Sequence, residues 1–240
     1  MTKSFDAYEK ISVATDVVIL TSDEVETNNP RMSAPKGLKV LLVKRDEEPF
    51  NGEWSLPGGF VDVNVGIEQA ARNKVAQKTG VENLYMEQLY TYGNELDRDP
   101  RGRVISIAYL ALLNKEDIKN NLSSGMKESQ WFWVMIKNGQ LLYSTDGKGY
   151  YLIDNLKIAF DHKQILQDAL ERLKNKVLYT DVAFQLLPEL FTMRELQDIF
   201  ELLHGKTIYS FRRFIESKVI ETELVSDGKA HRPAKLYRRR

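Results

Sequence analysis

Residues 56–81, LPGGFVDVNVGIEQAARNKVAQKTGV, constrain the fold of this chain more than any other stretch. Two adjacent glycines follow a proline at the end of a strand-like run, and a helical pattern comes next. Its apolar residues recur at helix spacing, at Ile67, Ala70, Ala71 and Val75. Gly80 stands where a C-cap glycine ends a helix. The stretch predicts a strand, a glycine loop and an amphipathic helix in direct succession.

This stretch resembles the Nudix box, whose pattern is G-x5-E-x7-R-E-U-x-E-E-x-G-U, with U a bulky aliphatic residue. With Gly59 as the first glycine, Val75 takes the middle aliphatic position, and Gly80 and Val81 take the last two. The spacing therefore matches over the whole motif. The resemblance implies an α/β fold, a Nudix-type α/β/α sandwich around a mixed sheet.

The acidic residues of the box are absent. Val65 stands at the first glutamate position, Asn73 and Lys74 replace the Arg-Glu pair, and Gln77 and Lys78 replace the Glu-Glu pair. In Nudix hydrolases these carboxylates hold divalent cations, because Mg²⁺ requires oxygen ligands. Ammonium groups cannot serve as such ligands. We therefore expect no metal site and no catalytic residues.

Composition places few limits on function. The chain has 240 residues, of which 42% are apolar and 28% are charged, and its formal net charge is zero. This length suits one large domain or two small ones. Cysteine is absent, which excludes a disulfide framework and a cysteine nucleophile. No apolar run is long enough to span a membrane, and the first residues lack a signal-peptide pattern, so we expect a cytoplasmic protein without membrane partners.

Basic residues are concentrated near the C-terminus. Residues 205–240 contain ten lysines and arginines and four acids, a net charge of +6, which leaves −6 for residues 1–204. Such asymmetry is typical of a nucleic-acid-binding module attached to an acidic body. A partly disordered basic tail is the alternative.

Apolar runs in the first part of the chain predict a β-rich body. Strands are expected at residues 11–21, 38–45, 84–93, 104–113 and 131–136. Residues 22–37 and 46–54 carry turn formers and are expected to be loops, and residues 139–155 an irregular hairpin or excursion. A helix is expected at residues 163–177. We place a domain boundary near Phe160, which divides the chain into residues 1–160 and residues 161–240.

The pattern changes after this boundary. Thr192 and Glu195 have the spacing of a capping box, and Gly205 can end the helix that they begin. Ser210 can cap a second helix at residues 211–220. Residues 221–225 and 234–238 are short strand candidates around a Ser-Asp-Gly turn. Two short helices, a tight turn and a hairpin predict a small winged helix-turn-helix domain.

A degenerate Nudix box followed by a winged helix resembles the NrtR family of Nudix-related transcriptional regulators. Similar stretches are KVLLVKR, PFNGEWSLPGGFVD, RDPRGR, AFDH, LPELFTMRELQ, SFRRFIE and RPAKLY, which together span nearly the whole chain. The resemblance implies a homodimeric regulator, a repressor in the main interpretation, that binds a palindromic operator in duplex DNA. It also implies an effector-binding first domain that takes ADP-ribose, a related nucleotide or a sugar-pathway metabolite, and no cofactor.

Arg212 and Arg213 begin the predicted recognition helix, whose N-terminal residues face base edges in the major groove. An arginine fork matches guanine, although contact with phosphate alone is the alternative. The expected DNA-binding residues are Ser210, Arg212, Arg213, Lys218, Lys229, Arg232 and Lys235. The last three, with His231, fall on the wing. We expect residues 238–240 to form a loose electrostatic tail.

The expected effector-binding residues are basic side chains, glycines and one aromatic residue near the box. They are Arg45, Phe50, Gly58, Gly59, Lys74, Lys78, Arg101 and Arg103. Arginine presents a fixed fork to phosphate oxygens, whereas surface salt bridges with Asp97 and Asp99 are the alternative. Phe50 and Trp54 either stack on a base or belong to the core. The two lysines lie one helical turn apart, and either point to water or hold a diphosphate in place of a metal ion.

Two other functions are compatible with the sequence. A Nudix hydrolase acting on ADP-ribose or a nucleoside-diphosphate sugar would use acids outside the box. The candidates are Asp62, Glu68, Glu87 and Glu128, which lack the paired spacing of the box. An adaptor protein without DNA affinity would leave the basic winged helix unused. His162 has no partner motif, and we expect it to be buried and hydrogen-bonded rather than catalytic.

Overall fold

The computed structural model describes residues 9–26, 34–82, 84–120, 129–226 and 233–240. Among the described strands, β1 to β9 form a nine-stranded sheet in the order β5-β6-β1-β2-β7-β8-β9, with β3 beside β2 and β4 beside β1. They are β1 (Ser12–Glu24), β2 (Lys36–Lys44), β3 (Trp54–Ser55), β4 (Gly58–Phe60), β5 (Tyr85–Tyr92), β6 (Val104–Leu113), β7 (Ser129–Lys137), β8 (Gln140–Ser144) and β9 (Tyr151–Leu152). Strands β1 and β6 are parallel, and the other described pairs are antiparallel.

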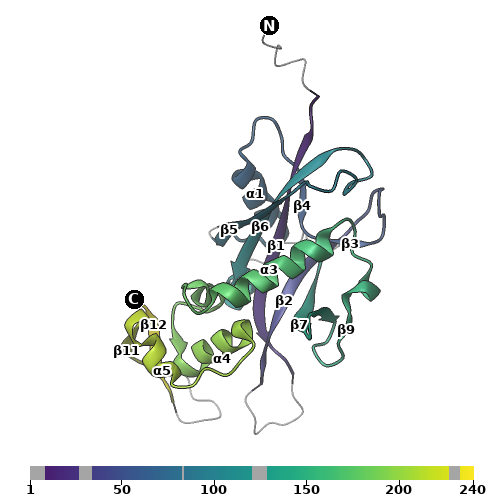
Figure 1. The fold of residues 1–240 in the computed structure, drawn as a ribbon. Helices are drawn as coiled ribbons and strands as arrows, with labels where there is room; N and C mark the ends of the chain where they lie inside the picture. The colour runs from purple at the N-terminus through teal and green to yellow at the C-terminus, as the bar shows by residue number, and fades with distance from the viewer. Residues whose placement is uncertain (1–8, 27–33, 83, 121–128, 227–232) are drawn as a thin grey trace.

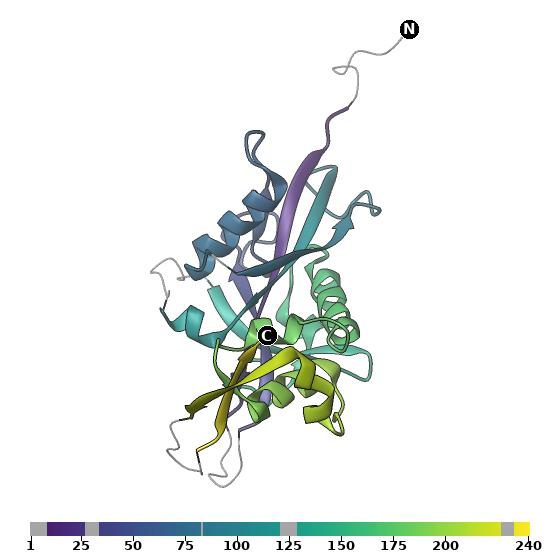
Figure 2. The ribbon, with the colours of Figure 1, turned by 90° about the vertical axis from the view of Figure 1, so that its left-hand side faces the viewer.

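Strand β1 is buried on both faces and carries two cores, because successive side chains of a strand point to opposite faces. Val17 and Ile19 pack with Val75 of α1 (Ile67–Thr79). Val18 and Leu20 point to the other face and belong to the core under α3 (His162–Lys176). Figures 1 and 2 show α1 and α3 on opposite sides of the sheet. The predicted α/β/α sandwich with a mixed sheet is confirmed.

Helix α3 joins the sheet to the C-terminal part of the chain. Its buried residues Ile165 and Leu166 belong to the same apolar core as Leu196 and Phe200 of α4 (Met193–His204). Figure 1 shows α3 lying across the sheet, with α4 beside it. The sequence pattern assigned this helix to residues 161–240, whereas its packing ties it to both parts of the chain.

The C-terminal residues form a winged helix domain, as predicted. It contains β10 (Phe191–Thr192), α4, α5 (Phe211–Ile215), β11 (Val219–Val225) and β12 (Lys235–Arg239), with the strand order β10-β12-β11. The capping box is present: Thr192 Oγ1 accepts from the Glu195 N–H at 3.2 Å, and Glu195 Oε2 accepts from the Thr192 N–H at 2.8 Å. Gly205 ends α4 with a φ of 74°.

Local structure differs from the sequence prediction in several places. Helix α5 is shorter than the predicted helix at residues 211–220, since a 3-10 turn (Glu216–Lys218) follows it and β-branched residues then continue as β11. Ser210 has a φ of 55° and its side chain does not cap the helix. Residues 139–155 are more regular than predicted, because β8 extends the sheet beside β7. Helix α2 (Lys115–Asn120) has no predicted counterpart.

The described residues contain no helix with the length and apolar character that crossing a lipid bilayer requires.

Replacing Thr192 with Ala should lower the free energy of unfolding by about 1 kcal/mol, because the helix loses its N-cap hydroxyl. Thr207→Ala, at an exposed position after α4, is the matched control and should change it by less than about 0.5 kcal/mol. Urea denaturation followed by circular dichroism measures both variants. Equal effects of the two substitutions would contradict the importance of the cap.

Candidate functional site

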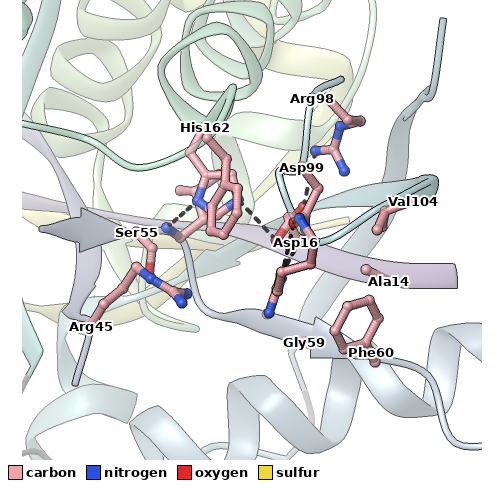
Figure 3. A pocket seen from close by; sticks show the side chains of 14 residues that line it. Ala14, Asp16, Arg45, Ser55, Gly59, Phe60, Arg98, Asp99, Val104 and His162 are labelled. Atoms are coloured by element: carbon pink, nitrogen blue, oxygen red, sulfur yellow. Dashed lines mark hydrogen bonds and ion pairs between the residues drawn. The ribbon is translucent and has the colours of Figure 1, made fainter. Parts of the chain in front are cut away.

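A pocket of about 110 Å³ opens beside the glycine pair of the box (Figure 3). Strands β1 and β4, the residue after β2, residues 98–104 and residues 160–162 line it. The side chains and glycines that shape it include Asp16, Arg45, Gly58, Gly59, Phe60, Arg98, Asp99, Arg101, Phe160 and His162. These segments are far apart in the sequence, so the pocket is a product of the fold and cannot be recognised from one motif.

The glycine pair brings the backbone of β4 close to β1. A Cβ at Gly58 would lie 2.4 Å from the Thr15 carbonyl oxygen and 2.5 Å from Asp16 Oδ1, which requires the backbone to move. Gly59 has a φ of 153°, a conformation that L residues rarely adopt. Both glycines line the pocket, and the absence of a side chain on Gly58 lets β4 lie close to Asp16.

Two arginines share one aromatic ring in the pocket. The Cζ atoms of Arg45 and Arg101 lie 4.9 Å and 5.3 Å from the centre of the Phe160 ring. Phe50 meets the same ring edge to face, with the ring centres 4.8 Å apart. Trp54 instead packs in the core. The structure thus brings Arg45, Phe50 and Arg101 together around Phe160, which the sequence pattern identified only as the position of the domain boundary.

Arg101 makes an ion pair and also lines the pocket. Its Nε and Nη2 donate to the two carboxylate oxygens of Asp99 at 2.9 Å and 2.7 Å. The hydrogen bonds from Arg101 hold the pKa of Asp99 below its ordinary value. The Arg101 side chain is still 42% exposed, so part of its fork is open to a ligand.

A buried polar network supports the pocket, and the sequence analysis missed most of it. The Arg98 side chain, 5% exposed, donates to both carboxylate oxygens of Asp161 at 2.5 Å and 2.8 Å and lies 3.8 Å from Asp16. His162 Nδ1 accepts from the Leu56 N–H at 3.0 Å, so the ring proton is on Nε2, which lies 3.2 Å from Asp16 Oδ1. The expectation that His162 is buried and hydrogen-bonded is confirmed.

Asp16 is the charged centre of this network. Burial raises its pKa, but the contacts with His162, Ser106 and Arg98 outweigh burial and hold the pKa of Asp16 below its ordinary value. The Ser106 hydroxyl donates to Asp16 Oδ2 at 2.5 Å. A lone acid within the apolar run ISVATDVVIL is the signal that would have drawn attention to this site in the sequence.

Lys74, Lys78 and Arg103 do not line the pocket. Arg103 donates to the Glu95 carbonyl oxygen at 3.2 Å. Lys74 lies against Gly59, with its Nζ 3.6 Å from the place of a Cβ on that glycine. Both lysines are half-buried on α1, and neither makes an ion pair or hydrogen bond with any residue that the structure describes.

The acids outside the box that the structure describes lie apart from one another. Within the described ranges, no cluster of three or more potential metal-binding side chains occurs. Glu68 and Glu87 are paired with basic side chains of α1 and α3, and Asp62 accepts from a backbone N–H. Glu128 lies outside the described residues.

The second candidate site is a groove of about 830 Å³ between α5 and strands β11 and β12. Ser210, Arg212 and Arg213 line it together. Two of the other predicted DNA-binding residues are engaged within the protein: Lys218 lies 2.8 Å from Asp181 Oδ1, and Lys235 lies 3.4 Å from Glu221 Oε1. Lys229, His231 and Arg232 lie outside the described residues.

The expected loose arginine tail is wrong for most of its length. Arg238 and Arg239 belong to β12, and Arg239 Nη2 lies 2.8 Å from Asp181 Oδ2. Asp181 therefore holds both Lys218 and Arg239 against the base of the wing, and these contacts keep the pKa of Asp181 below its ordinary value. The Arg240 N–H donates to the Lys218 carbonyl oxygen at 3.0 Å.

Replacing Asp16 with Asn should lower the free energy of unfolding at neutral pH by about 3 kcal/mol, because a partner is removed from a buried charge network. Since the folded protein depresses the pKa of Asp16, the carboxylate stabilises the fold above its ordinary pKa of 3.8. This stabilisation is lost as the pH falls below that value. Urea denaturation should therefore show a smaller difference in the free energy of unfolding between Asp16→Asn and the unmodified chain at acidic pH than at neutral pH. Asp97→Asn, at an exposed loop position, is the control, and an equal deficit there would contradict the assignment.

Comparison with known proteins matches both parts of the chain. The profile of the NUDIX domain matches residues 28–148, and that of the NrtR DNA-binding winged helix domain matches residues 183–239. An "ADPR responsive transcriptional repressor NtrR" of Acinetobacter baylyi is 36% identical over 206 residues, 84% of this chain and 75% of that protein. An "ADP-ribose pyrophosphatase" of Methanocaldococcus jannaschii is 33% identical over 136 residues, 55% of this chain and 66% of that protein.

A solved structure resembles nearly the whole fold. Shewanella oneidensis NrtR, crystallised in complex with a 27mer DNA, has a TM-score of 0.71 and 33% identity, and the match covers 95% of this chain and 93% of that chain. The order of the two domains and the extent of the match agree with the Acinetobacter and Shewanella relatives. The chain therefore belongs to the NrtR family, in which a Nudix domain precedes a DNA-binding winged helix domain.

Proposed function

We propose that this chain is an ADP-ribose-responsive transcriptional repressor whose Nudix domain senses its effector without hydrolysing it. The name of the Acinetobacter relative and the DNA in the Shewanella structure support this proposal. The observation that carries this proposal is that helix α3 takes part in both sites. Its first residue, His162, lines the arginine-containing pocket, and its apolar face packs with α4 of the winged helix domain. Residues 1–160 bind the effector, residues 161–240 bind DNA, and α3 connects the two activities.

The pocket has the chemistry to bind the diphosphate of ADP-ribose or a related nucleotide. Arg45 and Arg101 place guanidinium groups at the pocket beside Phe160. Nε and Nη2 of Arg45 donate to the Pro49 and Glu47 carbonyl oxygens, and those of Arg101 donate to Asp99, so the remaining N–H groups of both side chains would donate to phosphate oxygens. Its volume of about 110 Å³ is well below the roughly 300–1,000 Å³ of a site for a whole ligand. The pocket therefore holds the charged part of the nucleotide, and the rest of the ligand extends along the surface.

Helix α3 provides a physical connection from the pocket to the DNA-binding domain. Phe160 and His162 line the pocket, and His162 is the first residue of α3. Farther along the helix, the Tyr92 hydroxyl donates to Asp168 at 2.6 Å, so a polar contact from β5 also holds this element. The apolar face of α3 packs with α4 of the winged helix domain. A ligand that displaces residues 160–162 would therefore act on the helix that supports α4.

The lysines of the box explain how a sensor can bind a diphosphate without cleaving it. Lys74 and Lys78 stand where Nudix hydrolases carry metal-binding acids, and both are half-buried and unpaired within the described structure. Neither lysine lines the pocket, but Lys74 lies against Gly59 in its wall and Lys78 is one turn away on α1. Their positive charges would neutralise phosphate oxygens that extend beyond the pocket toward α1, in place of a metal ion. A lysine offers no metal-activated water for hydrolysis.

Repression would require a dimer. One winged helix makes a small footprint on DNA, and a symmetric pair doubles the phosphate contacts and reads a palindrome. We therefore propose a cytoplasmic homodimer that binds a palindromic operator.

ADP-ribose should bind equally well with EDTA or Mg²⁺ present, because the cation is supplied by the protein. Lys74→Glu combined with Lys78→Glu should weaken binding by about tenfold or more in EDTA. Lys174→Glu, at an exposed position of α3, is the control and should bind like the unmodified chain. Isothermal titration calorimetry measures all three.

Turnover of ADP-ribose to AMP with Mg²⁺ should stay far below about 1 s⁻¹, and chelator-sensitive turnover above this rate would refute the sensor proposal.

Replacing Arg212 and Arg213 together with Ala should weaken specific DNA binding more than about tenfold, since one bidentate base contact contributes roughly 1–3 kcal/mol. Arg172→Ala, on the exposed side of α3, is the matched control. Fluorescence anisotropy with a duplex selected by the unmodified protein measures the affinities. A folded double variant with unchanged affinity would exclude α5 as the recognition element.

A further inference from the structure

The two arginines at the start of α5 differ in how they are held. Arg213 is exposed, and it makes no ion pair or hydrogen bond with the residues that the structure describes. Arg212 donates from Nη2 to the hydroxyl oxygen of Tyr237 at 2.6 Å. One arginine is therefore free to sample many rotamers, and its neighbour is fixed at one end of its guanidinium fork.

Tyr237 is itself rigidly held. Its side chain is 4% exposed within the apolar core, and its backbone lies in β12, the middle strand of the small sheet. The Tyr237 hydroxyl donates to Glu221 Oε2 at 2.9 Å, and this hydrogen bond holds the pKa of Glu221 below its ordinary value. Three elements, α5, β11 and β12, thus contribute one residue each to a single hydrogen-bonded chain.

Chemistry fixes the direction of the hydrogen bonds in this chain. A guanidinium only donates, and an ionised carboxylate only accepts. The single hydroxyl hydrogen of Tyr237 therefore points to Glu221, and its oxygen lone pairs face Arg212. Tyr237→Phe would keep the ring in the core and remove both hydrogen bonds at once.

Resting on the proposed function, we propose that Tyr237 is a positioning residue that presets Arg212 for a bidentate contact with a base edge, while Arg213 contacts phosphate. Arg212, Tyr237 and Glu221 all line the groove between α5 and the wing strands. A bidentate base contact needs a planar fork in one orientation, which a fixed side chain supplies. A phosphate contact carries no base information and tolerates a mobile charge.

The position of Glu221 agrees with this role. A carboxylate in a groove that faces DNA repels phosphate, so it is unfavourable there without a compensating function. Its hydrogen bond with Tyr237 orients the hydroxyl, and Lys235 lies 3.4 Å from its other oxygen. The carboxylate therefore acts on the orientation of Arg212 through Tyr237.

The test uses the full chain and two duplexes, one enriched by the unmodified protein from a random-sequence library and one with the same bases scrambled. Tyr237→Phe should lower the affinity for the enriched duplex about tenfold, the scale of one bidentate base contact, and leave the scrambled duplex unaffected. Arg212→Ala should do the same, and the double variant should bind no more weakly than Arg212→Ala alone. Tyr179→Phe, which removes the hydroxyl of an exposed ring outside the winged helix, is the matched control.

Two further variants separate positioning from stability. Glu221→Ala leaves the core untouched and should lower the ratio of the two affinities, whereas Glu221→Gln keeps an acceptor for Tyr237 and should preserve it. Arg213→Ala should weaken both duplexes by the same factor and reduce the salt dependence of binding. These surface variants test the inference even where Tyr237→Phe fails to fold.

The inference is overturned if Tyr237→Phe keeps the original affinity ratio, weakens both duplexes equally, or multiplies with the effect of Arg212→Ala. A chain that enriches no duplex refutes the proposed function and this inference together. Enrichment by the unmodified chain with no change in the Tyr237→Phe and Glu221→Ala variants refutes the inference alone.

Discussion

The burial of β1 on both faces is the constraint on which the rest of this structure depends. A strand covered on both sides has no solvent-facing side, so a charged side chain on it needs partners inside the protein. Asp16 lies on this strand, and its charge is tolerated because Ser106 and His162 lie within hydrogen-bonding distance and Arg98 lies close by. The partners of Asp16 come from distant segments, and their convergence creates the pocket.

The regular elements could be predicted because their signals are local. The spacing of Val75 and Gly80 in the box, the capping box at Thr192 and the apolar strands each depend on a few neighbouring residues. The polar network could not be predicted, because Asp16, Arg98 and His162 are widely separated along the chain and no local pattern links them. The pairing of Arg101 with Asp99 is accessible to sequence reasoning, since both lie in one short loop.

The short helix α5 shows a different limit of sequence reasoning. Phe211, Phe214 and Ile215 have helical spacing, and the same periodicity continues to Val219. The chain instead turns at Glu216–Lys218 and enters β11, because Val219 and Ile220 pair with β12. Tertiary pairing overrides a helical pattern when the competing residues are β-branched. The sequence pattern predicts that Lys218 and Lys235 contact DNA, yet each lies beside an acidic residue that only the fold brings close.

The degenerate box separates the residues that build a fold from those that perform chemistry. Ala71 and Val75 point from α1 into the core against the sheet and preserve the geometry of the box, whereas Lys74 and Lys78 replace the acids that a hydrolase would need. The residues that build the helix of the box are therefore kept in this chain while its metal-binding acids are replaced.

The apolar core that runs from β1 through α3 to Phe200 and Tyr237 has a consequence for how the molecule unfolds. Parts of a chain that share one core lose it together, so heating should melt the sheet and the winged helix in a single cooperative transition. The DNA-binding part is then no transplantable module: cut away from the sheet, residues 161–240 would expose the apolar faces of α3, α4 and η3 (Val182–Leu186) that the sheet now covers, and they would aggregate.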